Sequence, residues 1–407
     1  MTLRLWIACG IGLTLLPTAP AGDWPQFLGP TRDNVSPETV APWTAAPEIL
    51  WKQPVGDSHS SPVVANGVVY AFYKPKGQDV DALAAFDART GEKKWEQSYP
   101  RDKFDPPFGS GPRGTPAIDG DKIYTLGNTG VLACWDAKNG QVAWKIDTLK
   151  QFKAKNLFFG VSTSPTIVGK NVVVMVGGKG SGIVAFDKLT GEVAWQATDD
   201  AASYASPLVV GSGADASLIF LTGKNLRALS AAGKEQWAVP FVDSLNESST
   251  TPVKTGDLYI GSSVTAGSIA VKPEGSGKVA SVWKAPKLTC YFSTPVVVGK
   301  HLYMVNGAAT LTNPAIDLRC VESETGKVLW TKSKIGKYHA AIIKTADEKL
   351  LMLDDAGNLI LWQPDPAEYK ELARAKVCGP TWAHPALTDG IVYVRDEKQL
   401  LAVKVGK

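Results

Sequence analysis

The chain of 407 residues contains only five cysteines, and no two of them are adjacent. The spacings C-x-x-C and C-x-x-C-H do not occur, which excludes covalently attached haem and the usual zinc-binding patterns. Signatures of a Ser/His/Asp nucleophile, a phosphate-binding loop or a basic aromatic patch are also missing. The sequence therefore lacks the short motifs by which common enzyme classes are identified.

A strong charge imbalance is absent as well. The formal net charge is +4, with 20% charged and 44% hydrophobic residues, which is typical of a globular protein. We therefore expect neither a nucleic acid nor another polyanion as a partner.

Only one long apolar run occurs, from Leu5 to Leu16, and it follows a single positive charge at Arg4. Small residues close this segment at Ala19 to Ala21, so residues 1–21 have the layout of a secretory signal peptide. A retained membrane anchor is the alternative, but a spanning helix needs about 20 apolar residues. We expect an exported protein, periplasmic or secreted, with no transmembrane segment after signal cleavage.

What the sequence does contain is a repeated motif, A-x-D-x-x-T-G-x-x-x-W. Two copies are unaltered and two carry conservative changes; they begin at Ala85, Ala185, Cys134 and Cys320. An aspartate at a strand end can accept bonds from backbone N–H groups of the turn, and glycine supplies the positive φ that a tight hairpin needs. The tryptophan on the next strand must be covered by a neighbouring sheet.

A second landmark, a Ser/Thr-Pro pair leading into an apolar strand, marks the start of each repeat. The eight starts, the last two with histidine, are Ser61, Thr115, Ser164, Ser206, Thr251, Thr294, His339 and His384. After a first interval of 54 residues, the spacings are 49, 42, 45, 43, 45 and 45, the range of a four-stranded propeller blade.

The last repeat stops without a fourth strand, whereas Pro47 to Val55 forms an unassigned strand before the first repeat. Joining them would close the ring and remove exposed sheet edges. The sequence thus predicts an all-β, eight-bladed β-propeller of four-stranded antiparallel blades over residues 47–407, closed by an N-terminal strand. Seven blades is the alternative, because Pro364 to Pro366 replaces the Thr-Gly turn of the seventh repeat and no tryptophan follows.

Residues 22–46 are Pro-rich and lack periodicity. Trp24, Phe27 and Trp43 would not stay solvated, so we expect this N-terminal arm to lie across the propeller, with a free docking peptide as the alternative. Deleting residues 22–55 should open the ring, whereas deleting only 22–40 should be mild.

Two of the four cysteines after the signal peptide, Cys134 and Cys320, occupy the small-residue position of the motif. We therefore predict that they are buried, free and four blades apart. The pairing of Cys290 with Cys378 stays open.

These motifs, together with the segment Asp23 to Phe27, resemble the pyrroloquinoline-quinone-type, tryptophan-docking repeat of quinoprotein alcohol dehydrogenases and of bacterial outer-membrane-assembly lipoprotein propellers. In the dehydrogenases, the resemblance implies a quinone held with calcium, a catalytic aspartate, a stacking tryptophan and often a disulfide of adjacent cysteines. This chain lacks adjacent cysteines and is much shorter. We therefore favour a non-catalytic protein-binding or scaffold module in the cell envelope, without a cofactor and monomeric. The alternative is a minimal oxidoreductase that depends on pyrroloquinoline quinone and calcium.

Two groups of candidate site residues fall near the blade starts. His59, His339 and His384 belong to neighbouring blades and could hold a transition metal or an anionic ligand, although they could equally cap a polar funnel. The predicted rim residues fit a contact surface for a protein or another envelope component, unless loops merely tolerate such side chains. They are Arg113, Tyr204, Glu247, Tyr291, Tyr338 and Trp382.

Overall fold

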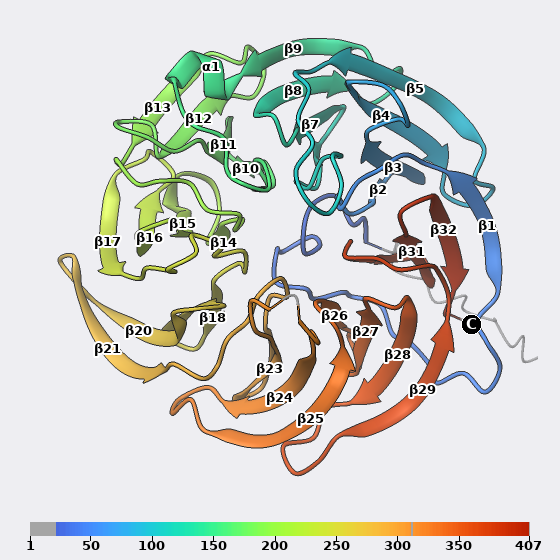
Figure 1. Cartoon of the computed structure of the whole chain (residues 1–407), viewed down its shortest axis with the longest axis vertical. Helices are drawn as coiled ribbons and strands as arrows, with labels where there is room; N and C mark the ends of the chain where they lie inside the picture. The colour runs from blue at the N-terminus through green and yellow to red at the C-terminus, as the bar shows by residue number, and fades with distance from the viewer. Residues whose placement is uncertain (1–21, 311, 407) are drawn as a thin grey trace, which may run out of the picture.

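The protein is described here by a computed structural model that covers residues 22–310 and 312–406, so the predicted signal peptide lies outside the described residues. Eight four-stranded antiparallel sheets form a closed ring around a central channel (Figure 1). This confirms the all-β, eight-bladed propeller and rules out the seven-bladed alternative. No helix in the described part of the chain has the length and apolar character needed to cross a bilayer.

The first four blades follow one another in chain order. Blade I comprises β2 (Val63–Ala65), β3 (Val68–Tyr73), β4 (Val80–Asp87) and β5 (Lys93–Pro100). Blade II comprises β6 (Ala117–Asp119), β7 (Lys122–Leu126), β8 (Val131–Asp136) and β9 (Val142–Asp147), followed by the short helix α1 (Thr148–Phe152). Blade III comprises β10 (Thr166–Val168), β11 (Asn171–Met175), β12 (Ile183–Asp187) and β13 (Val193–Ala197). Blade IV comprises β14 (Leu208–Val210), β15 (Ser217–Leu221), β16 (Asn225–Ser230) and β17 (Glu235–Pro240), with a 3-10 turn at Gly213–Asp215.

The remaining blades continue the ring. Blade V comprises β18 (Val253–Thr255), β19 (Leu258–Ser263), β20 (Gly267–Gly275) and β21 (Lys278–Ala285). Blade VI comprises β22 (Val296–Val298), β23 (His301–Asn306), β24 (Ile316–Glu322) and β25 (Val328–Gly336). Blade VII comprises β26 (Ala340–Lys344), β27 (Leu350–Asp354), β28 (Asn358–Gln363) and β29 (Lys370–Lys376). Blade VIII comprises β30 (Ala386–Thr388), β31 (Ile391–Arg395), β32 (Gln399–Lys404) and β1 (Ile49–Pro54).

Blade VIII is assembled from both ends of the sequence. β1 pairs antiparallel with β32, so that Ile49 lies opposite Val403 and Trp51 opposite Ala402, with an irregularity between them. Trp51 is buried and its Nε1 donates to the Ala88 carbonyl of blade I at 2.9 Å. The predicted closure by an N-terminal strand is therefore confirmed.

The turn of the repeated motif is built as its residue types predict. In blade III, Asp187 Oδ1 accepts hydrogen bonds from the backbone N–H groups of Leu189 and Thr190 at 2.9 and 3.1 Å. These bonds favour the carboxylate and lower the pKa of Asp187. Gly191 follows with a φ of 76°, a backbone conformation that residues other than glycine rarely adopt.

The same glycine also makes room for a neighbouring blade. A Cβ on Gly191 would lie 2.9 Å from the Trp144 ring of blade II, and Trp144 Nε1 donates to the Lys188 carbonyl at 3.2 Å. Equivalent contacts join Trp51 to Gly91, Trp95 to Gly140, Trp195 to Gly233 and Trp283 to Gly326. Each motif therefore both stacks a tryptophan on the next blade and receives one from the blade before.

Blade VII departs from the motif without losing its place in the ring. Its turn still receives a tryptophan, because Trp330 Nε1 of blade VI donates to the Asp365 carbonyl at 2.8 Å. Its outer strand carries Ala373 where the other blades carry tryptophan. The reason lies in blade VIII: β32 and β1 are far apart in the sequence, so no short turn between them could receive a tryptophan.

The N-terminal arm crosses the end of the channel, as the blue segment in the middle of Figure 1 shows. Trp24 exchanges two 2.9 Å backbone hydrogen bonds with Val64 of blade I, and Val35 bridges to Lys344 of blade VII. Trp24, Leu28 and Val40 are 2%, 1% and 0% exposed. The arm lies across the propeller as predicted. The burial of these side chains argues against the prediction that deleting residues 22–40 would be mild, and we now expect that deletion to destabilise the protein.

The four cysteines in the described part of the chain are buried and free. Cys134 lies on β8 of blade II and Cys320 on β24 of blade VI, at opposite sides of the ring. This confirms the predicted placement of this pair, and Cys290 and Cys378 do not pair either.

Candidate functional site

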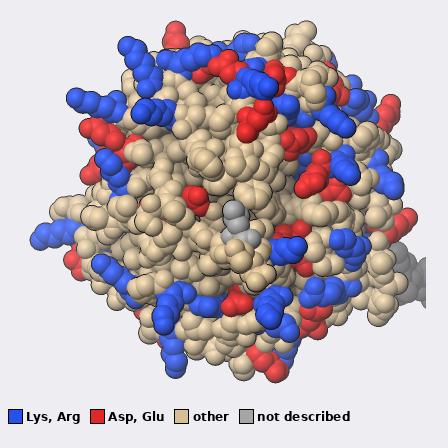
Figure 2. Space-filling view, viewed as in Figure 1, with Lys and Arg blue, Asp and Glu red and all other residues tan. Residues whose placement is uncertain are grey.

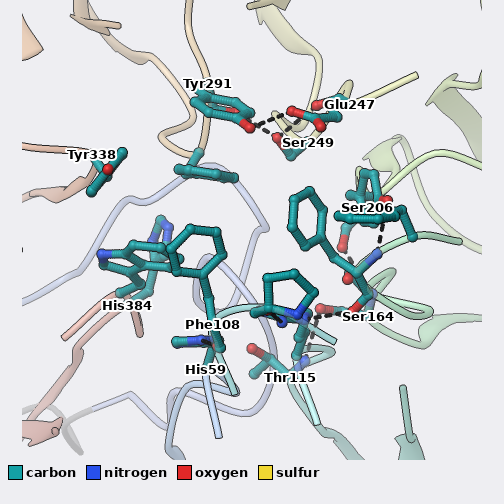
Figure 3. A pocket seen from close by; sticks show the side chains of 18 of the residues that line it. His59, Phe108, Thr115, Ser164, Ser206, Glu247, Ser249, Tyr291, Tyr338 and His384 are labelled. Atoms are coloured by element: carbon teal, nitrogen blue, oxygen red, sulfur yellow. Dashed lines mark hydrogen bonds between the residues drawn. The ribbon is translucent and has the colours of Figure 1, made fainter. Parts of the chain in front are cut away.

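A funnel-shaped cavity of about 470 Å³ occupies the channel on the face where the blades begin (Figure 3). Its walls come from the segments that connect one blade to the next, and Phe27 of the N-terminal arm lies at its inner end, 5.0 Å from the His384 ring. Because the arm crosses the channel behind Phe27, the funnel is a dead end rather than a tunnel. Its volume falls in the range of ~300–1,000 Å³ that is typical of ligand sites.

The Ser/Thr-Pro motif explains part of the lining. Five of the six Ser/Thr hydroxyls at blade starts, all but that of Thr251, accept a hydrogen bond from the backbone N–H of the equivalent residue one blade earlier, which ties neighbouring blades together at the channel. The distances are 3.0 Å from His384 to Ser61, 3.1 Å from Ser61 to Thr115, 3.0 Å from Thr115 to Ser164 and 2.9 Å from Ser164 to Ser206. Ser61, Thr115, Ser164 and Ser206 line the funnel, and we call these four the hydroxyl arc.

The segment between blades I and II is held rigidly over the funnel. Arg101 and Asp81 form a fully buried ion pair at 3.4 Å, and Arg101 Nη2 donates to the Ser110 carbonyl at 2.8 Å. Asp57 Oδ2 accepts from the backbone N–H groups of Ser110 and Gly111 at 2.6 and 3.0 Å. The backbone between these anchors is therefore fixed, although Phe108 has a φ of 64°, which is unfavourable for an aromatic residue.

Phe108 extends an aromatic wall across the funnel. Its ring centroid lies 5.3 Å from that of Trp382, and Trp382 stacks on His59 at 5.1 Å and on Phe292 at 5.4 Å. Such contacts add to the burial of large apolar area and hold each ring in place. The wall thus joins segments from blades I, V and VII into one surface.

Only two charged side chains, other than histidine, are found among the described residues that line the funnel: Arg113 and Glu247. Arg113 donates from Nε to the Phe159 carbonyl at 2.8 Å and from Nη2 to two further carbonyls, and burial lowers its pKa to about 10. Glu247 accepts a short hydrogen bond from the Tyr291 hydroxyl, and burial raises the pKa of Glu247. Arg113 therefore remains cationic at neutral pH without a carboxylate bonded to it.

The three candidate histidines do not act as one group. His59 Nε2 lies 2.6 Å from the Phe108 carbonyl, whereas the rings of His339 and His384 lie 5.1 Å from each other. Burial and Arg113 lower the pKa of His59 to about 4, and burial lowers that of His384 well below its usual value. The residues that the structure describes contain no cluster of three or more His, Cys, Asp or Glu side chains arranged to hold a metal ion.

All six predicted rim residues line this one funnel, together with His59 and His384; His339 lies beside His384. The sequence reasoning missed Phe108, Phe158 and Leu245, which are 43%, 70% and 50% exposed at the funnel mouth. We call these three the apolar collar. The signal that could have found them is their position between the last strand of one blade and the start of the next.

On the face shown in Figure 2, Lys, Arg, Asp and Glu lie mostly towards the periphery and the centre is largely uncharged. Fold and site together define an eight-bladed propeller whose channel forms an aromatic-lined, closed-ended cavity. A family model described as outer membrane protein assembly factor BamB matches residues 36–103 and 81–318, and the chain belongs to this family.

Individual relatives include both assembly factors and an oxidoreductase. BamB of Shewanella oneidensis is 24% identical over 374 residues, which cover 87% of this chain and 76% of the relative. The quinohemoprotein alcohol dehydrogenase ADH-IIG of Pseudomonas putida is 28% identical over 150 residues, covering 34% of this chain and 19% of the enzyme.

Solved structures show the same fold. BamB from Moraxella catarrhalis superposes with a TM-score of 0.60 at 15% identity, covering 88% of this chain and 98% of that structure. The quinohemoprotein alcohol dehydrogenase from Comamonas testosteroni gives a TM-score of 0.64 at 14% identity, covering 95% and 81%. Since propellers of this kind include both assembly factors and oxidoreductases, function must be argued from the site.

Proposed function

We propose that this protein is a non-catalytic scaffold, exported to the bacterial cell envelope, that binds a protein partner over its funnel as part of outer membrane protein assembly. Its family and its relative from Shewanella oneidensis, which carries the name of an assembly factor, support this function. The periplasmic side of the envelope is where an exported chain would meet such a partner.

The apolar collar is the observation that carries the proposal. Phe158 is 70% exposed and Leu245 is 50% exposed, although both have large apolar side chains. Clusters of exposed apolar side chains are rare on protein surfaces and commonly mark interaction sites. Aromatic anchors and an adjacent arginine are also typical of the residues that dominate binding energy at protein interfaces.

A quinone-dependent oxidoreductase is the other function that the fold permits, and the funnel residues do not fit its cofactor. No cysteine and no aspartate occurs among the described residues that line the funnel, and its only carboxylate, Glu247, is bonded to Tyr291. Trp382 already stacks on His59 and Phe292. The carboxylates and the free tryptophan face that a calcium-held quinone needs are therefore not provided.

The two functions are separated by adding pyrroloquinoline quinone and calcium to the purified protein and measuring absorbance and dye-linked alcohol oxidation. We expect neither saturable quinone binding nor turnover. Saturable binding with turnover would overturn the scaffold assignment.

Protein binding is tested by replacing the collar. A double variant, Phe158→Asp with Leu245→Asp, should lose envelope proteins that co-purify with the wild-type protein from solubilised membranes of the native bacterium. The matched control is Leu189→Asp, because Leu189 is 68% exposed but lies on a turn of blade III, away from the funnel. Equal recovery with the double variant and the control would contradict binding at the collar.

A further inference from the structure

The funnel floor carries hydrogen-bond donors that the protein itself does not use. Each hydroxyl of the arc accepts from a backbone N–H, and none donates to any atom of residues 22–310 or 312–406. The imidazole Nδ1 of His384 is also buried, with His384 only 6% exposed, and has no partner among these residues. The free hydroxyl hydrogens favour a ligand group that brings acceptor atoms to the floor, whereas His384 Nδ1 donates or accepts according to its tautomer.

Arg113 adds a positive charge to the same cavity. Its bonds from Nε and Nη2 go to backbone carbonyls, and the two hydrogens on Nη1 have no partner among the described residues. A partly buried guanidinium that is bonded only to neutral groups attracts a carboxylate or phosphate, and the Nη1 of Arg113 is left to donate a charge-assisted hydrogen bond to it. The guanidinium matches the single negative charge of a carboxylate, and the hydroxyl donors match its two acceptor oxygens.

The shape of the site limits what can carry that carboxylate. The apolar collar continues the wall of the funnel outwards, so an occupant that stayed inside would leave Phe158 and Leu245 exposed. At the inner end Phe27 lines the cavity, and the N-terminal arm, with Leu28 and Arg32 buried, crosses the channel there (Figure 1). A chain end can enter such a dead end as a single strand, whereas a loop must enter and leave, with two strands about 4.8 Å apart side by side.

We propose that the funnel binds the carboxyl-terminal end of a partner polypeptide whose last residues are apolar, with its terminal carboxylate at Arg113 and the hydroxyl arc and its side chains against the aromatic wall. This assignment rests on the proposed function and specifies which part of the partner is recognised. Glu247, which is bonded to Tyr291 in the wall of the funnel (Figure 3), disfavours a negative charge beside itself.

The test uses two fluorescein-labelled hexapeptides that end in Leu-Val-Phe and differ only in a free or an amidated carboxyl terminus. Fluorescence anisotropy with the full mature protein should give an affinity at least tenfold higher for the free acid, as expected for a charge-assisted hydrogen bond. Arg113→Gln should abolish the difference in affinity between the acid and the amide. Arg113→Lys should restore part of the preference, and the exposed Arg89→Gln should change neither affinity.

Three results would overturn the proposal. Equal affinity for the acid and the amide would show that the funnel does not recognise the carboxylate. The proposed function, protein binding at the apolar collar, would then stand without this inference. Failure of both peptides to bind at millimolar concentration would remove the chain-end ligand. Displacement of the acid by equimolar benzoate or pyrroloquinoline quinone would assign the site to a small acid instead. Failure of the proposed function itself is detected separately, by the loss of any effect of the collar variants on protein binding.

Discussion

Replacing Trp24 by alanine tests whether the N-terminal arm is an integral part of the propeller. The side chain is 2% exposed, and a Cβ on Gly29 would lie 2.8 Å from its ring, so the indole is packed on its own arm as well as on blade I. Truncating a buried tryptophan to alanine typically costs about 3–5 kcal/mol, from lost apolar burial and the cavity left behind. The backbone bonds to Val64 do not depend on the side chain and should remain. We therefore expect a loss of about 3 kcal/mol or more in the free energy of unfolding.

The assay is urea unfolding of the mature protein, followed by circular dichroism, with the midpoint and the slope recorded for each variant. Phe158→Ala is the matched control, since it also truncates a large aromatic residue but at a site that is 70% exposed, where the effect should stay within about 0.5 kcal/mol. Deleting residues 22–40 should destabilise the protein by at least as much as Trp24→Ala. If Trp24→Ala cost less than about 1 kcal/mol, or the deletion had no effect, the arm would not be part of the folded core.

Three further predictions address the blades, the histidines and the thiols. Gly191→Ala should be more destabilising than Gly180→Ala by about 1 kcal/mol or more in urea unfolding, because both glycines have a positive φ but only Gly191 lies against Trp144; equal losses would argue against tryptophan docking. Burial lowers the pKa of His339 to about 4, so the unfolded chain binds a proton at a higher pH than the folded chain does. The free energy of unfolding should therefore fall as the pH decreases from about 6.5 to 4, by up to about 3 kcal/mol from this residue. His339→Gln should make that slope shallower, with the remainder coming from His59 and His384, and an unchanged pH profile would contradict the shift. The four described cysteines should react with a thiol reagent only after unfolding, and a disulfide mapped between any two would contradict their burial as free thiols.

The fold could be predicted because its repeat is encoded locally. The eight blade starts share a spacing, and the motif turn needs a specific aspartate and glycine, so register follows directly from the sequence. The unassigned strand around Trp51 could be placed because a closed ring lacks sheet edges. What the sequence did not reveal was the second role of Gly191, which appears only when the Trp144 ring of the neighbouring blade is in place.

The site was predicted in part, for a physical reason. Residues such as Arg113 and Trp382 lie one or two positions before a blade start, and every blade start faces the channel. Phe108 and Phe158 lie inside long connecting segments without periodicity, and their positions depend on anchors such as the Asp81–Arg101 ion pair that sequence alone does not reveal. The depth at which the arm is buried was missed for the same reason, because a Pro-rich segment without periodicity carries no register.

Site-specific photo-crosslinking in living cells tests the central claim, protein binding at the funnel, most directly. A photoreactive phenylalanine analogue is placed at position 158 in one strain and at position 189 in another, since Phe158 and Leu189 are 70% and 68% exposed. The account predicts a discrete envelope-protein adduct from position 158 that is lost when Leu245→Asp is added, and none from position 189. Equal adducts from both positions, or no adduct from position 158, would contradict it.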